Sequence, residues 1–386
     1  MVSSLWPPEV LGGAELYAAA LAERLRGAGH TVAALTAGVD GDDVIAQVRP
    51  WGYPLTEYAS QPRTKRLVFH AGDVAHPGAG RTVDRAIADF RPDVVHSHAV
   101  QGMSAAVLTR VARRGVAHVH TLHDYWLLCQ RNTMVTAAGA ACTTRCRSCR
   151  AISSVRNRQL QHHPPDLLLA VSAAVARPHE DLLPWTRDRM RVLYNPVEHA
   201  TAMRPARDPG TPPTFGFLGQ VSAVKGIRTL VRAFAASDLA GARLVVAGRG
   251  TDVDAVVDVA GVDYRGWIDL AGREALYADI DALVVPSEWE DPAPLVVNEA
   301  RARGIPVIGA RAGGIPELIA PASEPLLFPS GDADALAARL REFAAEPARF
   351  VAPPEAAPLD WAGHLAGVTR AYADARTLAT TERGHH

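Results

Sequence analysis

The stretch LVVPSEWEDPAPLVVNEARARGIPVIGARAGGIPEL, residues 283–318, decides which fold the chain can adopt. Its opening apolar run stops at Pro286, which favours a short buried strand of a parallel sheet. Pro294 can occupy the first position of a helix that Gly304 is placed to end. A second strand is expected to begin at Pro306, so the stretch forms a β–α–β unit. Free amides and the positive dipole end at the helix start then predict a site for an anionic ligand.

Two carboxylates lie eight positions apart in this stretch, at Asp291 and Glu299. The pattern resembles the signature of retaining GT-B glycosyltransferases of glycosyltransferase family 4, in which both positions are usually glutamate. The resemblance implies that Asp291 faces the hydroxyls of a donor sugar and that Glu299 holds the ribose of a nucleotide. It also implies that a diphosphate binds the amides near Pro294, Leu295 and Val296. Without the resemblance, both carboxylates would be ordinary surface charges beside a helix.

Composition indicates an ordinary globular protein. A chain of 386 residues favours two domains, and its 48% hydrophobic and 21% charged residues are typical of soluble proteins. The net charge of -1 gives no argument for binding nucleic acid or an anionic membrane surface. No apolar run approaches the roughly 18 residues of a membrane span, and no signal peptide is recognisable. We therefore expect a cytoplasmic protein with at most peripheral membrane contact.

The resemblance covers nearly the whole chain and implies an α/β protein with the GT-B fold. Two Rossmann-like, doubly wound domains would then face an interdomain cleft. We expect the acceptor-side domain over residues 1–205, followed by a linker of boundary composition, RPARDPGTPP, at 204–213. The nucleotide-sugar-binding domain would span 206–360. A terminal helix over 361–380 would cross back and pack on the first domain.

The amino terminus is short for this fold. Only Met1–Ser4 precede a proline-containing loop, whereas a doubly wound domain needs a full first strand. We therefore expect the natural chain to start several residues upstream. Gly12 and Gly13 follow, and a glycine pair between a strand and a helix lets backbone approach a ligand closely. The resemblance places this loop near the donor phosphate and the acceptor, while a simple tight turn is the alternative.

The sequence HSH ends a predicted strand over residues 93–96. His96 and His98 stand at alternate positions and therefore point to the same face. Ligands bind outside the carboxyl ends of strands in open α/β sheets, which makes His98 a candidate site residue. The resemblance implies that His98 reaches the donor sugar. A packed, hydrogen-bonded histidine is the alternative.

The next predicted strand, over 117–122, runs into TLHDYW. This phrase resembles one at the acceptor rim of family members, which implies an acceptor-side role for His123, Asp124 and Trp126. The earlier segment 40–80 has no clear period, and we expect loops with one strand over 65–69.

All four cysteines of the chain follow within 21 residues and have the spacing C-x12-C-x3-C-x2-C: Cys129, Cys142, Cys146 and Cys149. In a cytoplasmic chain this clustering favours metal binding over disulfides. Four thiolates would hold a tetrahedral structural zinc and stabilise a loop that has no core of its own. The spacing matches no standard zinc ribbon or finger, so reduced free thiols are the alternative.

The second domain opens with a predicted strand and the phrase GQVSAVKG, residues 219–226. In the family this phrase carries an arginine and a lysine that hold the donor diphosphate. Lys225 is present, but Gln220 stands in place of the arginine and supplies no charge. The resemblance also places Trp267 against the nucleobase.

Taken together, these features predict a retaining enzyme of the hexosyltransferase or wider glycosyltransferase class that needs no metal for its chemistry. The donor would be a nucleotide-diphosphate sugar, and the acceptor a hydroxyl of a natural product, a glycolipid or a polysaccharide precursor. The expected catalytic residues are His98, Lys225 and Asp291. A nucleotide-sugar epimerase on the same fold is one alternative. A non-catalytic nucleotide-sugar-binding protein is another, because Gln220 and Asp291 depart from the family pattern. The sequence favours no oligomeric state, sugar or nucleotide base.

Overall fold

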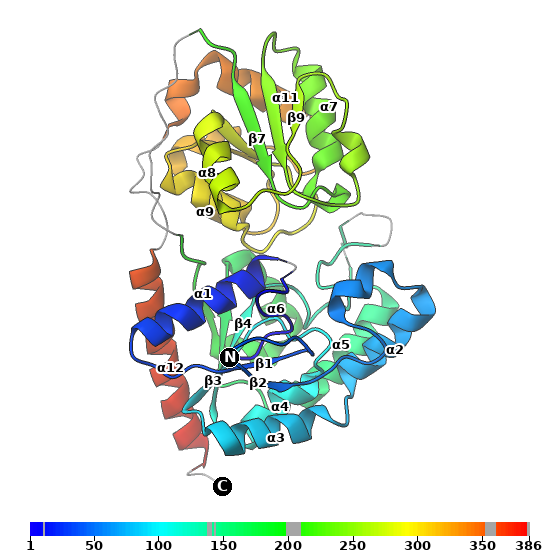
Figure 1. The fold of residues 1–386 in the computed structure, drawn as a ribbon, viewed down its shortest axis with the longest axis vertical. Helices are drawn as coiled ribbons and strands as arrows, with labels where there is room; N and C mark the ends of the chain where they lie inside the picture. The colour runs from blue at the N-terminus through cyan, green and yellow to red at the C-terminus, as the bar shows by residue number, and fades with distance from the viewer. Residues whose placement is uncertain (11, 137–140, 143, 198–209, 352–359, 384–386) are drawn as a thin grey trace. The chain divides into compact units, whose positions relative to one another are not determined.

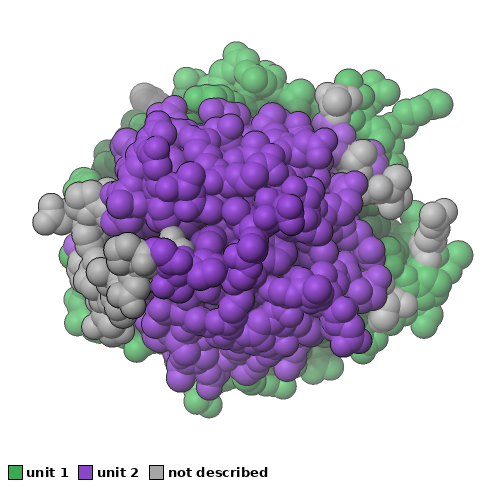
Figure 2. Space-filling model, turned by 90° about the horizontal axis from the view of Figure 1, so that it is seen from above, with its two compact units in different colours: residues 1–133, 144–194, 362–386 green, residues 134–143, 195–361 purple. Residues whose placement is uncertain are grey.

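The computed structural model describes residues 1–10, 12–136, 141–142, 144–197, 210–351 and 360–383. The chain forms two compact units, coloured separately in Figure 2. Unit 1 contains three segments, Met1–Thr133, Thr144–Tyr194 and Ala362–His386. Unit 2 contains two segments, Met134–Thr143 and Asn195–Trp361. The linker expected over 204–213 lies largely outside the described residues.

Unit 1 is built on a parallel sheet with the strand order β3-β4-β5-β6. A second parallel pair, β1 with β2, is joined to this sheet through Val2. Val2 forms parallel bridges to Leu35 on one side and to Ser97 on the other, so the amino-terminal residues occupy the centre of the sheet. The strands are β1 (Ala34–Thr36), β2 (Val44–Gln47), β3 (Val94–Ser97), β4 (Ala117–Leu122), β5 (Leu167–Ala170) and β6 (Met190–Val192).

Helices pack around this sheet (Figure 1). In the carboxyl-terminal helix, Ala371, Ala375 and Ala379 recur every fourth residue and pack against β4 and β5. This helix therefore belongs to the same unit as the amino terminus, as the family resemblance implies. No described helix is long and apolar enough to cross a membrane. The helices are α1 (Gly13–Gly27), α2 (Arg63–Val74), α3 (Ala79–Phe90), α4 (Ala105–Arg113), α5 (Arg147–Leu160), α6 (Ala173–Leu182) and α12 (Trp361–Arg383).

The strand expected over 65–69 is wrong, because these residues lie inside α2. Phe69 is 1% exposed, whereas Leu67 and Val68 are 70% and 50% exposed. An amphipathic helix buries only one of its faces, so one inward-facing side chain per turn is enough. A buried strand would need the whole apolar run to be covered.

Unit 2 contains a second parallel sheet, with the strand order β11-β10-β7-β8-β9. Phe215 and Phe217 of β7 share a buried core with Leu336 and Phe343 of α11. Two parallel sheets with crossover helices give both units a Rossmann-like architecture, as expected. The strands are β7 (Thr214–Leu218), β8 (Arg243–Ala247), β9 (Val262–Tyr264), β10 (Ala282–Val285) and β11 (Val307–Gly309). The helices are α7 (Ile227–Ser237), α8 (Leu270–Asp279), α9 (Leu295–Ala302), α10 (Ile315–Leu318) and α11 (Ala333–Ala345). Short 3-10 helices lie at Leu55–Ser60, Pro184–Arg189, Ala223–Lys225, Val253–Ala255, Pro321–Leu326 and Pro347–Phe350.

The stretch 283–318 forms the predicted β–α–β unit from β10, α9 and β11. Gly304 follows α9 with a φ of 69°, the left-handed conformation that ends helices. Pro294 differs from the expectation. Its ψ of 116° is extended, so it is the N-cap of α9, and Leu295 is the first helical residue.

Candidate active site

The sheet of unit 2 has a topological switch point between β7 and β10. The chain runs from β7 outward to β8 and β9, and then returns to β10 on the opposite side of β7. In open α/β sheets, ligands bind at the carboxyl ends of the strands where the order reverses. Lys225 follows β7 and Asp291 follows β10. The fold brings them together, with Lys225 Nζ 2.6 Å from Asp291 Oδ2.

The local backbone holds Asp291 in place. Its side chain is 5% exposed, and Oδ2 accepts a hydrogen bond of 3.0 Å from the Ser287 hydroxyl. The Asp291 carbonyl also accepts a 2.8 Å bond from the Gly314 amide. Gly313 has a φ of +54°, and a Cβ there would lie 2.2 Å from the same carbonyl oxygen. Glycine is therefore needed at position 313 for this close approach.

Lys225 is positioned by a second close approach. Gly226 has a φ of +75°, and a Cβ there would lie 1.8 Å from the Pro286 carbonyl oxygen. The Lys225 ammonium lies 5.1 Å from the centre of the Trp289 ring, a cation–π distance. The lysine side chain remains 26% exposed. Its ammonium can therefore contact an anionic ligand while it stays near Asp291.

The amino terminus of α9 opens after Pro294. No side chain of the described residues caps this helix. The amides of its first turn, including those of Leu295 and Val296, then have the geometry and polarity that suit a phosphate group.

Glu299 is held by α8. Oε1 accepts a 2.8 Å hydrogen bond from Arg273 Nη1, and Oε2 accepts a 2.7 Å bond from the Tyr277 hydroxyl. Burial, together with the charge of Glu299, raises the pKa of Tyr277 well above its usual value, so its hydroxyl stays a donor. Each carboxylate oxygen keeps a further lone pair, and the side chain is 19% exposed. The fixed carboxylate can thus accept from hydroxyls of a ligand.

The remaining predicted donor residues of unit 2 are exposed. Gln220 lies after β7 at the same edge as Lys225, with its side chain open to solvent. Trp267 is 61% exposed, and the Arg249 guanidinium lies 5.3 Å from its ring centre. A flat aromatic surface paired with a cation can stack on a planar ring.

Unit 1 brings its predicted residues together in the same way. His98 follows β3, while His123 and Asp124 follow the neighbouring strand β4. His98 Nδ1 lies 3.2 Å from His123 Nε2. The His96 and His98 rings are 4.1 Å apart, as expected for residues on one face. Within the described structure, His98 Nε2 is buried and has no hydrogen-bond partner.

Burial sets the protonation of these groups. It holds the pKa of His98 well below its usual value, with further contributions from His96 and His123. It also lowers the pKa of His123 to about 3. Both imidazoles are therefore neutral at pH 7. The opposite applies to Asp124, because burial raises the pKa of its carboxyl to about 7. Such a carboxyl can take up or release a proton near neutral pH.

Trp126 is not exposed at this edge. It is 4% exposed, and its Nε1 donates a 2.9 Å hydrogen bond to Asp73 Oδ2. The Arg156 guanidinium lies 3.8 Å from the Trp126 ring centre and 2.9 Å from the same Asp73 oxygen. Arg156 Nη1 also donates to the Trp126 carbonyl. Trp126 thus anchors the loop that carries His123 and Asp124.

Gly12 is the N-cap of α1 and Gly13 its first residue, and the Gly12 amide donates a 2.9 Å hydrogen bond to Glu15 Oε2. The same helix supplies Tyr17, which the sequence analysis missed. Its ring lies 5.7 Å from the His98 ring and 5.1 Å from the His123 ring. Its hydroxyl lies 2.7 Å from His364 Nε2 of α12. No sequence signal relates positions that are so far apart along the chain.

A zinc site at the four cysteines is not supported. Among the residues that the structure describes, no group of three or more His, Cys, Asp or Glu side chains is arranged to hold a metal ion. Cys129, Cys146 and Cys149 belong to unit 1, whereas Cys142 belongs to unit 2. The Cys142 amide donates to the Met134 carbonyl within its own segment. The close spacing in sequence therefore does not assemble a metal site among the residues that the structure describes.

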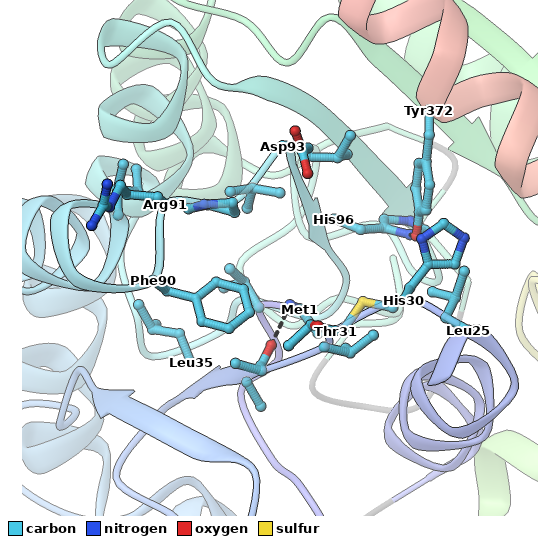
Figure 3. A pocket seen from close by; sticks show the side chains of 18 of the residues that line it. Met1, Leu25, His30, Thr31, Leu35, Phe90, Arg91, Asp93, His96 and Tyr372 are labelled. Atoms are coloured by element: carbon cyan, nitrogen blue, oxygen red, sulfur yellow. Dashed lines mark hydrogen bonds between the residues drawn. The ribbon is translucent and has the colours of Figure 1, made fainter. Parts of the chain in front are cut away.

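A cavity of about 650 Å³ lies elsewhere in unit 1 (Figure 3). Met1, Phe90, Asp93 and Tyr372 are among the residues that line it. Its lining includes residues that precede β1 and β3, together with Leu35 of β1 and His96 of β3, but not His98. The Met1 amino group donates a 2.6 Å bond to the Ala33 carbonyl, and burial lowers its pKa to about 5. None of the predicted site residues lines this cavity, which distinguishes it from the candidate active site.

Comparison with known proteins agrees with this architecture. Residues 11–201 match the family described as Glycosyltransferase Family 4, and residues 212–346 match Glycosyl transferases group 1. The chain belongs to the group 1 glycosyltransferases. The glycogen synthase of Mycobacterium tuberculosis is 27% identical to this glycosyltransferase. The match covers 90% of this chain and 86% of the glycogen synthase. A GDP-mannose-dependent alpha-mannosyltransferase of Corynebacterium glutamicum is 28% identical over 62% of this chain and 55% of that protein.

Solved structures show the same GT-B fold. The sucrose-phosphate synthase of Thermosynechococcus elongatus superposes with a TM-score of 0.68 at 21% identity, covering 94% of this chain and 93% of that one. HepE of Anabaena, solved in complex with UDP-glucose, has a TM-score of 0.62 at 17% identity and is covered completely, as is this chain. At these identities the likeness concerns the fold of this glycosyltransferase alone.

Proposed function

We propose that this glycosyltransferase moves a sugar, with retention of configuration, from a nucleotide-diphosphate donor to an acceptor hydroxyl. The acceptor class is a natural product, a glycolipid or a polysaccharide precursor. The observation that carries the proposal is the Lys225–Asp291 pair at the switch point of the unit 2 sheet. It unites a cation for a diphosphate with a carboxylate for sugar hydroxyls at the edge where such sheets bind ligands.

The donor contacts follow from this arrangement. The Lys225 ammonium and the first amides of α9, at Leu295 and Val296 after Pro294, bind the diphosphate. Glu299 accepts from the ribose hydroxyls, because Arg273 and Tyr277 hold its carboxylate in place. Gln220 adds an uncharged donor to the phosphates, and the exposed Trp267 ring stacks on the base.

Transfer then breaks the bond between the anomeric carbon and the β-phosphate oxygen. The acceptor oxygen bonds to that carbon on the same face, and its proton passes to the departing phosphate. Negative charge grows on the phosphate as the bond breaks, and Lys225 with the α9 dipole stabilises it. These groups perform the role of a divalent cation, so the proposed reaction needs no metal.

Unit 1 supplies the acceptor side. The unpartnered Nε2 of His98 contacts the donor sugar and positions its anomeric centre. His123 and Asp124 contact the acceptor, and Gly12 and Gly13 give backbone access beside α1. The neutral state of His98 supports positioning by hydrogen bonds over catalysis by charge.

The named relatives support a nucleotide-sugar donor. One is called GDP-mannose-dependent, and HepE was solved with UDP-glucose. A nucleotide-sugar epimerase and a non-catalytic binding protein are the competing functions, and Gln220 and Asp291 are the departures that favour the latter.

Titration of wild type and Lys225→Ala with UDP-, GDP- and ADP-sugars tests the proposal. We expect at least one donor to bind wild type and to bind the variant about 10-fold or more weakly, as for the loss of a charged hydrogen bond. Equal binding by both proteins would overturn the assigned site.

A further inference from the structure

Three of the four cysteines meet in unit 1, where the loop after β4 contacts the start of α5. The sulfurs of Cys129 and Cys149 lie 3.8 Å apart, and both residues are buried. Cys146 is exposed and is the N-cap residue of α5. A disulfide has a sulfur separation of about 2.05 Å, so a movement of about 1.8 Å would join Cys129 to Cys149.

The exposed thiol has surroundings that favour its thiolate. Cys146 Sγ lies 3.2 Å from the Ser148 hydroxyl. Hydrogen bonds from this hydroxyl and from the Cys149 amide lower the pKa of Cys146. Contact with Cys129 and burial raise the pKa of Cys149, which therefore remains a thiol. The thiolate is the reactive form of a cysteine. Cys146 is therefore the thiol that reacts first with an oxidant from solution.

The arrangement suits sulfur–sulfur chemistry better than metal binding. Within the described ranges, no three potential ligands surround a common point. Cys146 and Cys149 are nonetheless spaced as C-x-x-C at a helix start, a pattern found in reactive dithiols. Cys129 adds a third sulfur behind them, away from solvent.

We propose that Cys129, Cys146 and Cys149 form a redox-modification site that reacts with a hydroperoxide. The Cys146 thiolate attacks one peroxide oxygen and the O–O bond breaks, which forms a sulfenic acid; the other oxygen takes a proton from solvent and leaves as water or an alcohol. Cys149 then bonds to the Cys146 sulfur, and its proton leaves with the displaced hydroxide as water. Finally Cys129 attacks the Cys149 sulfur and passes its proton to the departing Cys146 thiolate. Two thiols lose two electrons, and the peroxide gains them.

The product, a Cys129–Cys149 disulfide, ties the loop after β4 to α5. These elements already meet through Arg156, which donates to the Trp126 carbonyl, and through Asn157, whose Nδ2 donates a 2.8 Å bond to the Leu127 carbonyl. The same loop begins with His123 and Asp124. A consequence for activity rests on the proposed function: oxidation should change the KM for the acceptor several-fold. Nucleotide binding should not change, since its proposed residues lie in unit 2.

Peptide mapping tests the chemistry without any assay of transfer. The purified protein is treated with hydrogen peroxide, its free thiols are alkylated, and it is digested with trypsin. Cleavage puts each cysteine on its own peptide, because arginines lie between them at Arg131, Arg145 and Arg147. We expect peptide 115–131 to be linked to peptide 148–150, and reductant to reverse the link. Full alkylation of all three thiols after peroxide treatment would overturn the proposal, as would one tightly bound zinc per chain.

Cysteine-to-serine variants show which residue takes part in each step of disulfide formation. Cys146→Ser should slow disulfide formation about 10-fold or more, because the accessible thiolate is lost. Cys129→Ser should stop the sequence at a Cys146–Cys149 bond. Cys142→Ser is the matched control and should react as wild type does. An unchanged rate in Cys146→Ser would contradict the assigned entry point, and the wild-type map decides the proposal even if a variant fails to fold. If no nucleotide sugar bound to the protein, the proposed function would be refuted. The peptide map would still decide whether the cysteines form the disulfide.

Discussion

Lys225 Nζ lies 2.6 Å from Asp291 Oδ2, and this ion pair joins the carboxyl ends of two neighbouring strands, β7 and β10. The two residues are 66 positions apart in the chain. The lysine is partly exposed while the aspartate is buried, so the pair presents its cationic side to solvent. An anionic ligand can therefore reach the ammonium without displacing the carboxylate from Ser287.

Replacing Lys225 by alanine should lower kcat/KM about 10²- to 10³-fold, because the charge that stabilises the leaving diphosphate is lost. Release of nucleoside diphosphate from the donor measures this effect. The chain has only one other lysine, Lys65, which is exposed on α2. Lys65→Ala is thus a matched control and should be as active as wild type. Comparable losses in both variants would count against a specific role for Lys225.

Replacing Glu299 by alanine should weaken nucleotide binding by about 1–3 kcal/mol, the range for a lost hydrogen bond to a charged group. The variant also leaves Arg273 and Tyr277 without their partner, so some loss of thermal stability is expected. Calorimetric titration well below the melting temperature separates the two effects. Glu324→Ala, an exposed glutamate of the same unit, is the control. Unchanged nucleotide affinity in Glu299→Ala would remove this residue from the site.

Replacing His98 by alanine should reduce kcat/KM about 10²-fold, or about 2.7 kcal/mol of transition-state stabilisation. Donor affinity should change far less, because the proposed diphosphate and ribose contacts lie in unit 2. Steady-state kinetics beside donor titration gives both quantities. The exposed His162→Ala is the control. Near wild-type transfer by His98→Ala would leave this residue as a packed strand-end histidine.

Because several histidines are buried in the neutral form, we expect the free energy of unfolding to fall in mild acid. Burial lowers the pKa of His118, His120 and His123 to about 3, and that of His179 and His364 to about 4. The unfolded chain binds these protons near pH 6.5, whereas the folded chain does not. Stability is therefore present above pH 6.5 and is lost as the pH falls toward 4, by on the order of 2 kcal/mol per histidine at pH 5.

Asp124 acts in the opposite direction, because its folded pKa of about 7 exceeds the unfolded value. The five histidines outnumber this single carboxyl, so their effect on the free energy of unfolding is the larger one. Denaturant titrations at pH 7.5, 6 and 5 measure the net effect, with His162→Ala as a control that should keep the wild-type slope. A free energy of unfolding that does not change over this range would contradict the burial of neutral histidines.

Sequence patterns predicted the elements whose signals are local. The β10–α9–β11 unit follows from an apolar run, a proline and Gly304, all within one short stretch. The same reasoning misread α2, because the run around Phe69 is apolar along the chain but buried on one face only. Pro294 marked the start of α9 correctly to within one position.

Relations across the chain needed the fold. Lys225 and Asp291 were both predicted from resemblance, but their ion pair depends on the order of strands in the sheet. Tyr17 and its partner His364 carry no joint signal in the sequence. Clustering of cysteines along the chain predicted a single metal site, whereas no three potential ligands among the described residues are arranged to hold a metal ion.

The most direct test of the account is the product formed from a nucleotide sugar with water as the acceptor. Proton NMR follows the first-formed sugar anomer, and phosphorus NMR follows the nucleotide. We expect nucleoside diphosphate and a sugar that keeps the anomeric configuration of the donor, with this activity reduced about 10²- to 10³-fold in Lys225→Ala. An inverted sugar would contradict retention. A changed nucleotide sugar without release of diphosphate would favour an epimerase, and no turnover of any bound donor would contradict the proposed glycosyl transfer.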